Sequence, residues 1–226
     1  MDKKMNVLDV RLDNYTAKDA MKAVTEFLRN EAVNTVEIIT VDSLMCAAQT
    51  EGLKADIAAL DLVVAGDSAI LEAAGVPEKK KLQEAQNQVF LKMLFRYFHK
   101  NGLKIFVLTD TEEEGELLRQ YVEENHAGIV LTGSAAVPED ESADDQIINS
   151  INGTEADLVI AYMRSPGQEQ FIRRVKNVLN VKLWLGIGKA QMASAGTVRW
   201  QDRLRDFVER RLMKREVQKE KKKKEF

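Results

Sequence analysis

Apolar and polar positions along the chain follow two periods that alternate. Runs that are fully apolar or have period two predict strands, and stretches with period 3.6 between them predict helices. The predicted strands are residues 5–12, 36–41, 60–65, 104–109, 129–132, 157–162 and 182–187. The predicted helices are residues 16–30, 43–58, 69–74, 84–100, 111–125, 144–151 and 167–179. This βαβα order predicts an α/β fold with a Rossmann-like, mostly parallel sheet flanked by helices.

Residues that begin or end helices support several of these boundaries. Asn101 and Gly102 form a helix stop, and Asp110 with the residues after it is an acidic helix start. The segment Pro77–Lys81 is expected to be a polar loop between the two halves of the sheet.

The composition is that of a globular protein. Of 226 residues, 45% are hydrophobic and 31% are charged, which allows a sizeable core and excludes a disordered chain. Cys46 is the single cysteine, so a disulfide framework and a cysteine metal site are both excluded. The sequence has no run of 18 apolar residues and no signal-type apolar core at its start. A cytoplasmic location is therefore expected.

Charge is distributed unevenly and divides the chain in two. Residues 197–226 carry 12 Lys and Arg against 6 Asp and Glu, while residues 1–196 carry 21 against 30. We expect an α/β domain over 1–196 and a basic helical appendage over 197–226. An apolar stripe runs through this appendage at Trp200, Leu204, Phe207, Val208 and Leu212.

Two interpretations of the appendage stay open. The helix packs on its own domain, or it docks on an anionic membrane surface, where each Lys or Arg contributes about 1 kcal/mol. Nucleic acid is not an expected partner, because the remaining body is acidic and shows no RNA-recognition or helix-turn-helix pattern. A homo-oligomer is compatible with the sequence.

Polar residues follow four of the predicted strands. In open parallel sheets the ligand crevice lies beyond the carboxyl ends of strands, where helix amino termini present unpaired N–H groups. The four turns are Thr40–Asp42, Ala65–Ser68, Ser165–Glu169 and Gly186–Gly188. Their placement makes them the candidate ligand-binding segments.

Each turn also has a purely structural interpretation. Thr40 and Asp42 are suited to cap the helix that follows, as are Asp67 and Ser165. Gly186 and Gly188 form a lone GxG, which often only permits a tight turn. The two histidines, His99 and His126, have no partner pattern for zinc or a catalytic triad, so a structural or solvated role is expected for both. (The structural and ligand-binding interpretations are not exclusive.)

In four ordered places the chain resembles the WecG/TagA/CpsF family of bacterial glycosyltransferases. Thr40–Asp42 is similar to the family's T-x-N turn, and Leu60–Asp67 resembles its A-D-L-V-x-P-D-G strand. Arg164–Ile172 is similar to G-S-P-K-Q-E-x-W-I, and Gly186–Gly196 to G-x-G-x-x-x-D-x-x-A-G. The resemblance covers roughly residues 5 to 200.

The resemblance implies an inverting transfer of an N-acetylmannosamine-like sugar from a UDP-sugar to a lipid-linked acceptor at the cytoplasmic membrane face. It implies Asp67 as the candidate catalytic base, with Thr40 and Asp42 near the acceptor or sugar. Around the nucleotide it implies Gln168, Glu169, Gly186 and Gly188. Neither a metal nor another cofactor is required.

Several positions depart from the family pattern and support an alternative. The family's base aspartate aligns with Gly66, one residue before Asp67, and its lysine aligns with Gly167. Met192 replaces an aspartate and Arg164 a glycine, and residues 82–91 lack the family's R-V-x-G-x-D stretch. The alternative is a non-catalytic nucleotide-sugar-binding or regulatory relative that kept the fold.

Overall fold

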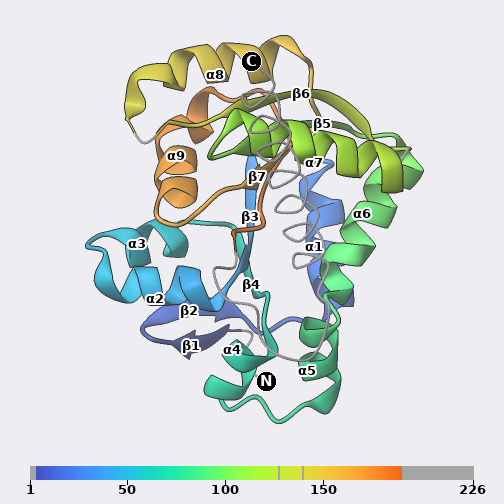
Figure 1. The fold of residues 1–226 in the computed structure, drawn as a ribbon. Coiled ribbons are helices and arrows are strands. Elements are labelled where there is room, and N and C mark those ends of the chain that lie inside the picture. Colours follow the sequence, from blue (N-terminus) through green and yellow to red (C-terminus); the bar gives the residue numbers. More distant parts are fainter. Residues whose placement is uncertain (1–3, 127, 139, 190–226) are drawn as a thin grey trace, which may run out of the picture.

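A parallel sheet with helices on both faces forms the body of the protein (Figure 1). The computed structural model describes residues 4–126, 128–138 and 140–189. The strands are β1 (Lys4–Val7), β2 (Val10–Asp13), β3 (Asn34–Ile39), β4 (Leu62–Ala65), β5 (Lys104–Thr109), β6 (Val130–Ala136), β7 (Leu158–Tyr162) and β8 (Leu183–Gly186). The helices are α1 (Ala17–Phe27), α2 (Val41–Gln49), α3 (Leu53–Ala58), α4 (Ser68–Ala73), α5 (Lys79–Gln86), α6 (Val89–Asn101), α7 (Glu112–Asn125), α8 (Asp144–Gly153) and α9 (Gly167–Val175). Two 3-10 turns, at Glu141–Ala143 and Lys176–Val178, complete the described elements.

The main sheet has six strands in the order β4-β3-β8-β7-β5-β6, and every described pair in it is parallel. Parallel neighbours need crossover connections, and the long helical stretches between strands supply them. The predicted α/β fold with a Rossmann-like sheet flanked by helices is confirmed. All six carboxyl ends consequently lie along one edge of the sheet.

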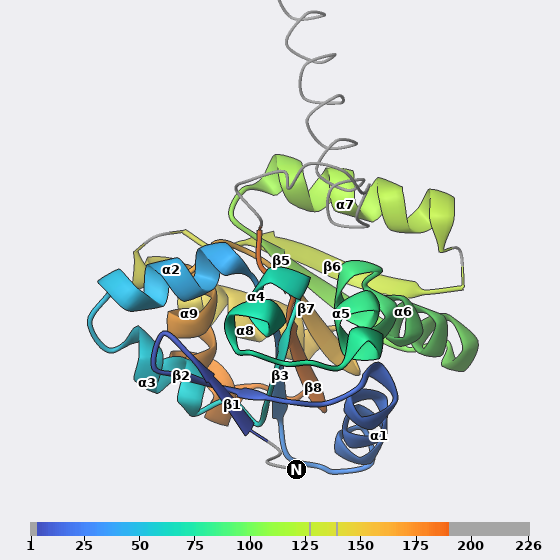
Figure 2. The same ribbon diagram turned by 90° about the horizontal axis from the view of Figure 1, so that it is seen from below.

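Helices cover both faces of the sheet, because successive side chains of a strand point to opposite faces. On β7, Leu158 and Ile160 pack into a core cluster with α1, α6 and α7, whereas Val159 and Ala161 pack with α8 and α9. A third cluster joins α2 and α3 to the small β1–β2 sheet. Both views show α1 and α6 on one side of the sheet and α2, α3 and α9 on the other (Figure 1, Figure 2).

The prediction of a single strand over residues 5–12 is wrong. This segment forms the antiparallel hairpin β1–β2, with Leu8 and Asp9 at the turn at φ values of 54° and 64°. Two consecutive left-handed residues give the tight turn that fits the twist of a hairpin. Neither residue is glycine or asparagine, so the usual turn signal is missing from the sequence. The hairpin forms a two-stranded sheet of its own beside β4, where the Val63 N–H donates to Asp13 Oδ2 at 3.0 Å, and the described chain begins ββα.

Two predicted helices are each broken in the structure. Residues 43–58 form α2 and α3, separated at Gly52, whose φ is 82°. Residues 84–100 fall into α5 and α6, separated at Gln88, whose φ is 50°. The expected polar loop Pro77–Lys81 is wrong in its second half, because α5 already begins at Lys79. The predicted helix stop at Asn101 and Gly102 is confirmed, with Gly102 in the left-handed region.

The predicted appendage, residues 197–226, lies outside the described residues, as does the end of the predicted domain beyond residue 189. Among the helices that are described, none combines the length and the apolar character needed to cross a membrane.

Candidate functional site at the carboxyl ends of the strands

The four polar turns follow four strands that are neighbours in the sheet. In sheet order these strands are β4, β3, β8 and β7, so their turns lie side by side along one edge. The Gly66 N–H donates to the Ile39 carbonyl at 2.8 Å, which joins the β4 turn to the end of β3. The Gly188 N–H donates to Gln168 Oε1 at 3.2 Å, which joins the β8 turn to α9.

Gly186 and Gln168 pack so closely that a side chain at position 186 would not fit. A Cβ there would lie 2.5 Å from Gln168 Nε2. Gln168 is 1% exposed, and its Nε2 has no hydrogen-bond partner among the described residues. A larger residue at position 186 would thus displace the Gln168 amide, whose buried donor lies at the strand ends.

Thr40 begins α2, as the structural interpretation predicted. Its hydroxyl accepts a hydrogen bond from the Ser43 N–H at 3.1 Å, the geometry of an N-cap. The side chain is 1% exposed. A Cβ at Gly188 would lie 3.5 Å from both Thr40 Cγ2 and Ser43 Oγ, so the β8 turn lies against the start of α2. Asp42 occupies the first turn of this helix.

The predicted N-cap role of Ser165 is wrong. Helix α9 begins at Gly167, and Pro166 occupies its N-cap position after a cis peptide bond. The Ser165 hydroxyl instead donates to Glu169 Oε1 at 2.6 Å. Because Glu169 is buried, this bond ties the exposed turn to the interior of the protein.

A second buried glutamate, Glu37 of β3, faces Glu169. Burial raises the pKa of Glu37 well above its usual value, and the neighbouring carboxyl of Glu169 adds to this. Burial likewise raises the pKa of Glu169, against the opposing effect of the Ser165 hydrogen bond. The hydrogen bond between the two carboxyls raises the pKa of Glu37 and opposes the rise at Glu169, which favours the proton on Glu37. One oxygen of each carboxyl has no partner among the described residues.

Glu37 was not among the predicted site residues. The signal for it in the sequence is a charged residue between the apolar Val36 and Ile38 of β3. Residue Glu37 is opposite Gly186 in the β3–β8 register, which brings it beneath the candidate turns.

Asp67 lies at the N-cap position of α4, but its carboxylate makes no capping bond to the helix. The capping interpretation therefore fails for this residue. Asp67 is 5% exposed, and it does not line either of the two hollows described below. Gly66, immediately before it, lines one of them.

One hollow opens between the start of α2 and the β7 turn, and we call it the crevice. Its cavity volume is about 240 Å³, and it is open to solvent on one side. This volume is somewhat below the range of about 300–1,000 Å³ that is usual for small-molecule sites. Its lining residues are Asp42, Ser43, Met45, Cys46, Gln49, Arg164, Ser165 and Lys189.

Charged residues from a fifth strand end reach the edge of the crevice. Asp110 follows β5, and its Oδ2 accepts from Arg164 Nε at 3.0 Å and from Lys189 Nζ at 2.7 Å. Glu114 of α7 also pairs with Lys189. Asp110 was predicted only as a helix start, and Lys189 was not among the predicted site residues. Nothing in the local sequence indicates that these residues meet.

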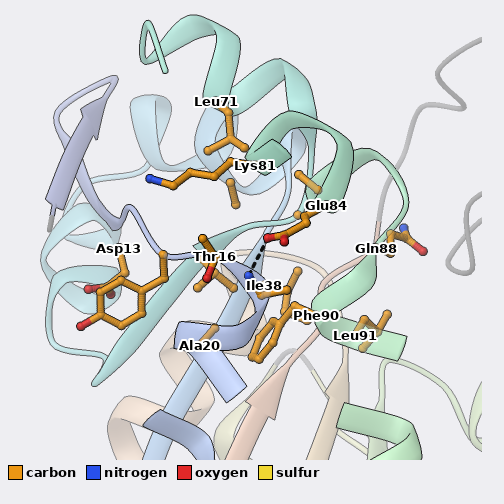
Figure 3. Close-up of a pocket in the computed structure, with 16 residues that line it drawn as sticks. Asp13, Thr16, Ala20, Ile38, Leu71, Lys81, Glu84, Gln88, Phe90 and Leu91 are labelled. Carbon is orange, nitrogen blue, oxygen red and sulfur yellow. Dashed lines mark hydrogen bonds between the residues drawn. The ribbon is translucent and has the colours of Figure 1, made fainter. Parts of the chain in front are cut away.

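The other hollow lies on the far side of β3 and β4, and we call it the α1 pocket (Figure 3). Its wall is mostly apolar, and its cavity volume is only about 50 Å³. Among its polar side chains are Lys81 and Glu84 of α5 and Gln88, which precedes α6. Glu84 Oε2 accepts from the Ala17 N–H at 2.8 Å, the bond drawn in Figure 3, and Lys81 Nζ donates to Asn14 Oδ1 at 2.7 Å.

The histidines lie away from both hollows. His99 Nδ1 accepts from the Gly128 N–H at 3.1 Å, and the His126 ring lies 5.3 Å from that of Phe95. Burial lowers the pKa of His126. These contacts fit the structural role expected of the histidines. Within 4–126, 128–138 and 140–189, no three His, Cys, Asp or Glu side chains are grouped as a metal site would need.

Comparison with known proteins adds two similarities. The model of the glycosyl transferase WecG/TagA/CpsF family matches residues 5–204. The N-acetylglucosaminyldiphosphoundecaprenol N-acetyl-beta-D-mannosaminyltransferase of Staphylococcus aureus (strain MRSA252) is 22% identical over 195 residues, which cover 85% of this chain and 76% of the relative.

Proposed function

This chain belongs to the WecG/TagA/CpsF glycosyltransferase family, and on that premise we propose that it transfers an N-acetylhexosamine-type sugar, similar to N-acetylmannosamine, from a UDP-sugar to a lipid-linked acceptor. The product would serve cell-surface polysaccharide or teichoic acid synthesis. The observation that carries the proposal is that the turns after β4, β3, β8 and β7 lie side by side at one edge of the sheet. The name of the staphylococcal relative supports both the sugar class and the lipid-linked acceptor.

The donor would bind across the carboxyl ends of these strands. Helix α2 begins at Val41 and presents its amino end toward the crevice through Asp42 and Ser43, which favours a diphosphate there. Gln168, Gly186 and Gly188 pack together beside this position, and the buried Glu169 anchors the turn through Ser165. Thr40 and Asp42 would then lie near the transferred sugar or the acceptor.

Asp67 is the proposed general base. In an inverting transfer, the base takes the proton of the acceptor hydroxyl while the acceptor oxygen bonds to the anomeric carbon. The bond from that carbon to the diphosphate breaks at the same time, and UDP leaves with the electron pair. Asp67 directly follows Gly66, which lines the α1 pocket, so its backbone lies beside this hollow.

A non-catalytic nucleotide-sugar-binding relative is the second candidate. It is favoured by two hydrogen bonds that occupy polar groups of the α1 pocket: the Ala17 N–H donates to Glu84, and Lys81 donates to Asn14. The burial of Asp67 favours it as well. Proposals for the appendage, including docking on an anionic membrane surface, concern residues outside the described ranges.

Substitution Asp67→Asn tests the two candidates. A general base typically contributes a factor of about 10² to 10⁴, so turnover of a UDP-N-acetylhexosamine should fall by about that factor. The substitution should leave the thermal stabilisation by UDP in place. Turnover equal to wild type would rule out Asp67 as the base. If the wild type shows stabilisation by UDP without any turnover, the binding relative is favoured, and if no uridine nucleotide changes the melting temperature, the transferase proposal fails.

A further inference from the structure

Two cations line the crevice, and the protein holds them differently. Lys189 Nζ lies 2.7 Å from Asp110 Oδ2, pairs with Glu114 as well, and is 5.4 Å from the centre of the Tyr162 ring. Its side chain is only 13% exposed. Two carboxylates thus already neutralise the lysine.

Arg164 is held by one carboxylate, which contacts only the Nε edge of its guanidinium group. Its backbone N–H donates to Asp110 Oδ1 at 3.3 Å and its Nε to Asp110 Oδ2 at 3.0 Å. The side chain is 58% exposed. In the part of the chain that the structure describes, Nη1 and Nη2 have no hydrogen-bond partner, so both remain available to a ligand. An arginine fixed on one edge presents the other edge as a preorganised fork for phosphate oxygens.

From this arrangement we propose that Arg164 binds the diphosphate of a nucleotide in the crevice, with Asp110 as its positioning residue. The inference rests on the proposed function and assigns a phosphate-binding residue within it. The amino end of α2, at Asp42 and Ser43, lines the same crevice and adds an environment that favours anions.

Asp42 narrows the class of ligand. A carboxylate among the lining residues repels a bare phosphate ion, but it accepts hydrogen bonds from hydroxyl groups. A diphosphate that carries a ribose or hexose offers such hydroxyls. The crevice is therefore suited to a nucleoside diphosphate better than to inorganic phosphate or pyrophosphate.

The loop around Pro166 allows a variant in which the cation is moved from position 164 to position 167. The family pattern has glycine where Arg164 stands and lysine where Gly167 stands, so this chain carries its cation on the other side of Ser165 and Pro166. A Cβ added to Gly167 would meet no atom within 4 Å, so a lysine fits there.

Titration calorimetry with UDP, pyrophosphate and uridine tests the proposal. Arg164→Gln should lower the affinity for UDP and for pyrophosphate about tenfold to a hundredfold, the usual range for hydrogen bonds to a charged group. The affinity for uridine should not change. Arg173→Gln is the matched control. Arg173 has a side chain 60% exposed, pairs through Nε with Asp56 at 3.2 Å, and does not line the crevice. This control should bind all three ligands as the wild type does.

The double variant Arg164→Gly with Gly167→Lys should bind UDP more tightly than Arg164→Gly alone, because it restores a cation in the same loop. Equal UDP affinity of wild type and Arg164→Gln would overturn the inference and leave the proposed function standing. An equal loss for uridine would also overturn it, because the effect would then not concern the phosphates. If the wild type binds neither UDP nor pyrophosphate, the proposed function and this inference fail together.

Discussion

The crevice and the α1 pocket lie on opposite sides of the end of β3, and they differ in how their polar groups are used. In the crevice, cations from the β7 and β8 turns meet carboxylates from β5 and α7, and Arg164 keeps N–H groups for a ligand. In the α1 pocket, the wall is mostly apolar, and Glu84 and Lys81 bond to the start of α1.

This difference separates two chemical tasks. Under the proposed function, binding a diphosphate requires N–H donors that are oriented before the ligand arrives, and Arg164 would offer them in the crevice. Apolar parts of an acceptor would meet the mostly apolar wall of the α1 pocket. The departures from the family pattern fall at both hollows. Gly66 and residues 82–91 lie at the α1 pocket, and Arg164 and Gly167 belong to the turn at the crevice.

The largest effect on stability is expected from Gly66→Ala, at the boundary between the hollows. A Cβ there would lie 2.9 Å from the Ile39 carbonyl oxygen and 3.0 Å from Ile38 Cγ2, and a backbone atom cannot move aside cheaply. We expect a loss of about 2–3 kcal/mol in the free energy of unfolding, measured by urea denaturation. Gly167→Ala, which enters open space, is the matched control and should stay within about 0.5 kcal/mol of wild type. Equal stability of both variants would contradict the close packing of the β3 and β4 ends.

The next effect concerns the buried carboxyl pair under the crevice. Because burial raises the pKa of Glu37, the folded state binds its proton more tightly than the unfolded state does. The unfolded state begins to lose this proton near the usual value of 4.5, so the contribution of Glu37 is fully present below that pH. This stabilisation is lost as the pH rises from 4.5 through the raised pKa of Glu37 in the folded state. The loss is about 1.4 kcal/mol for each unit by which the folded pKa exceeds the unfolded one.

Substitution Glu37→Gln removes this titration and keeps the shape. We expect the variant to be more stable than wild type at neutral pH, by about 1 kcal/mol or more, and to lose less stability between pH 4.5 and neutrality. Urea denaturation at a series of pH values measures this. Glu37→Asp retains a carboxyl and should retain the decline of stability with pH, even if its overall stability is lower. An unchanged pH dependence in Glu37→Gln would show that the pair does not share a proton.

The smallest effect is expected from Glu84→Gln in the α1 pocket. The amide oxygen can still accept from the Ala17 N–H, so the variant loses the interaction of the charge with the amino end of α1 and the 3.9 Å ion pair with Lys80. This amounts to about 0.5–1 kcal/mol in the free energy of unfolding. UDP affinity should not change, since Glu84 does not line the crevice. A tenfold change in UDP affinity would mean that the two hollows act as a single site.

Local patterns predicted much of this molecule. The parallel sheet follows from strands separated by helix-length segments, and the polar turns after β3, β4, β7 and β8 could be identified without coordinates. The N-cap role of Thr40 and the helix stop at Gly102 were also predicted, since each depends on a few adjacent residues. The β1–β2 hairpin was missed, because Leu8 and Asp9 adopt a turn that their residue types rarely signal.

The sequence by itself determined the alternation of elements and the chemical character of each turn, because period and capping are properties of neighbouring residues. Only the tertiary structure decided which strands are neighbours, and with that the pairing of Asp110 with Arg164 across 54 positions and the meeting of Glu37 with Glu169. Strand order follows from how whole helices pack against the two faces of the sheet. That free energy is shared among many long-range contacts, and no short segment of the chain encodes it.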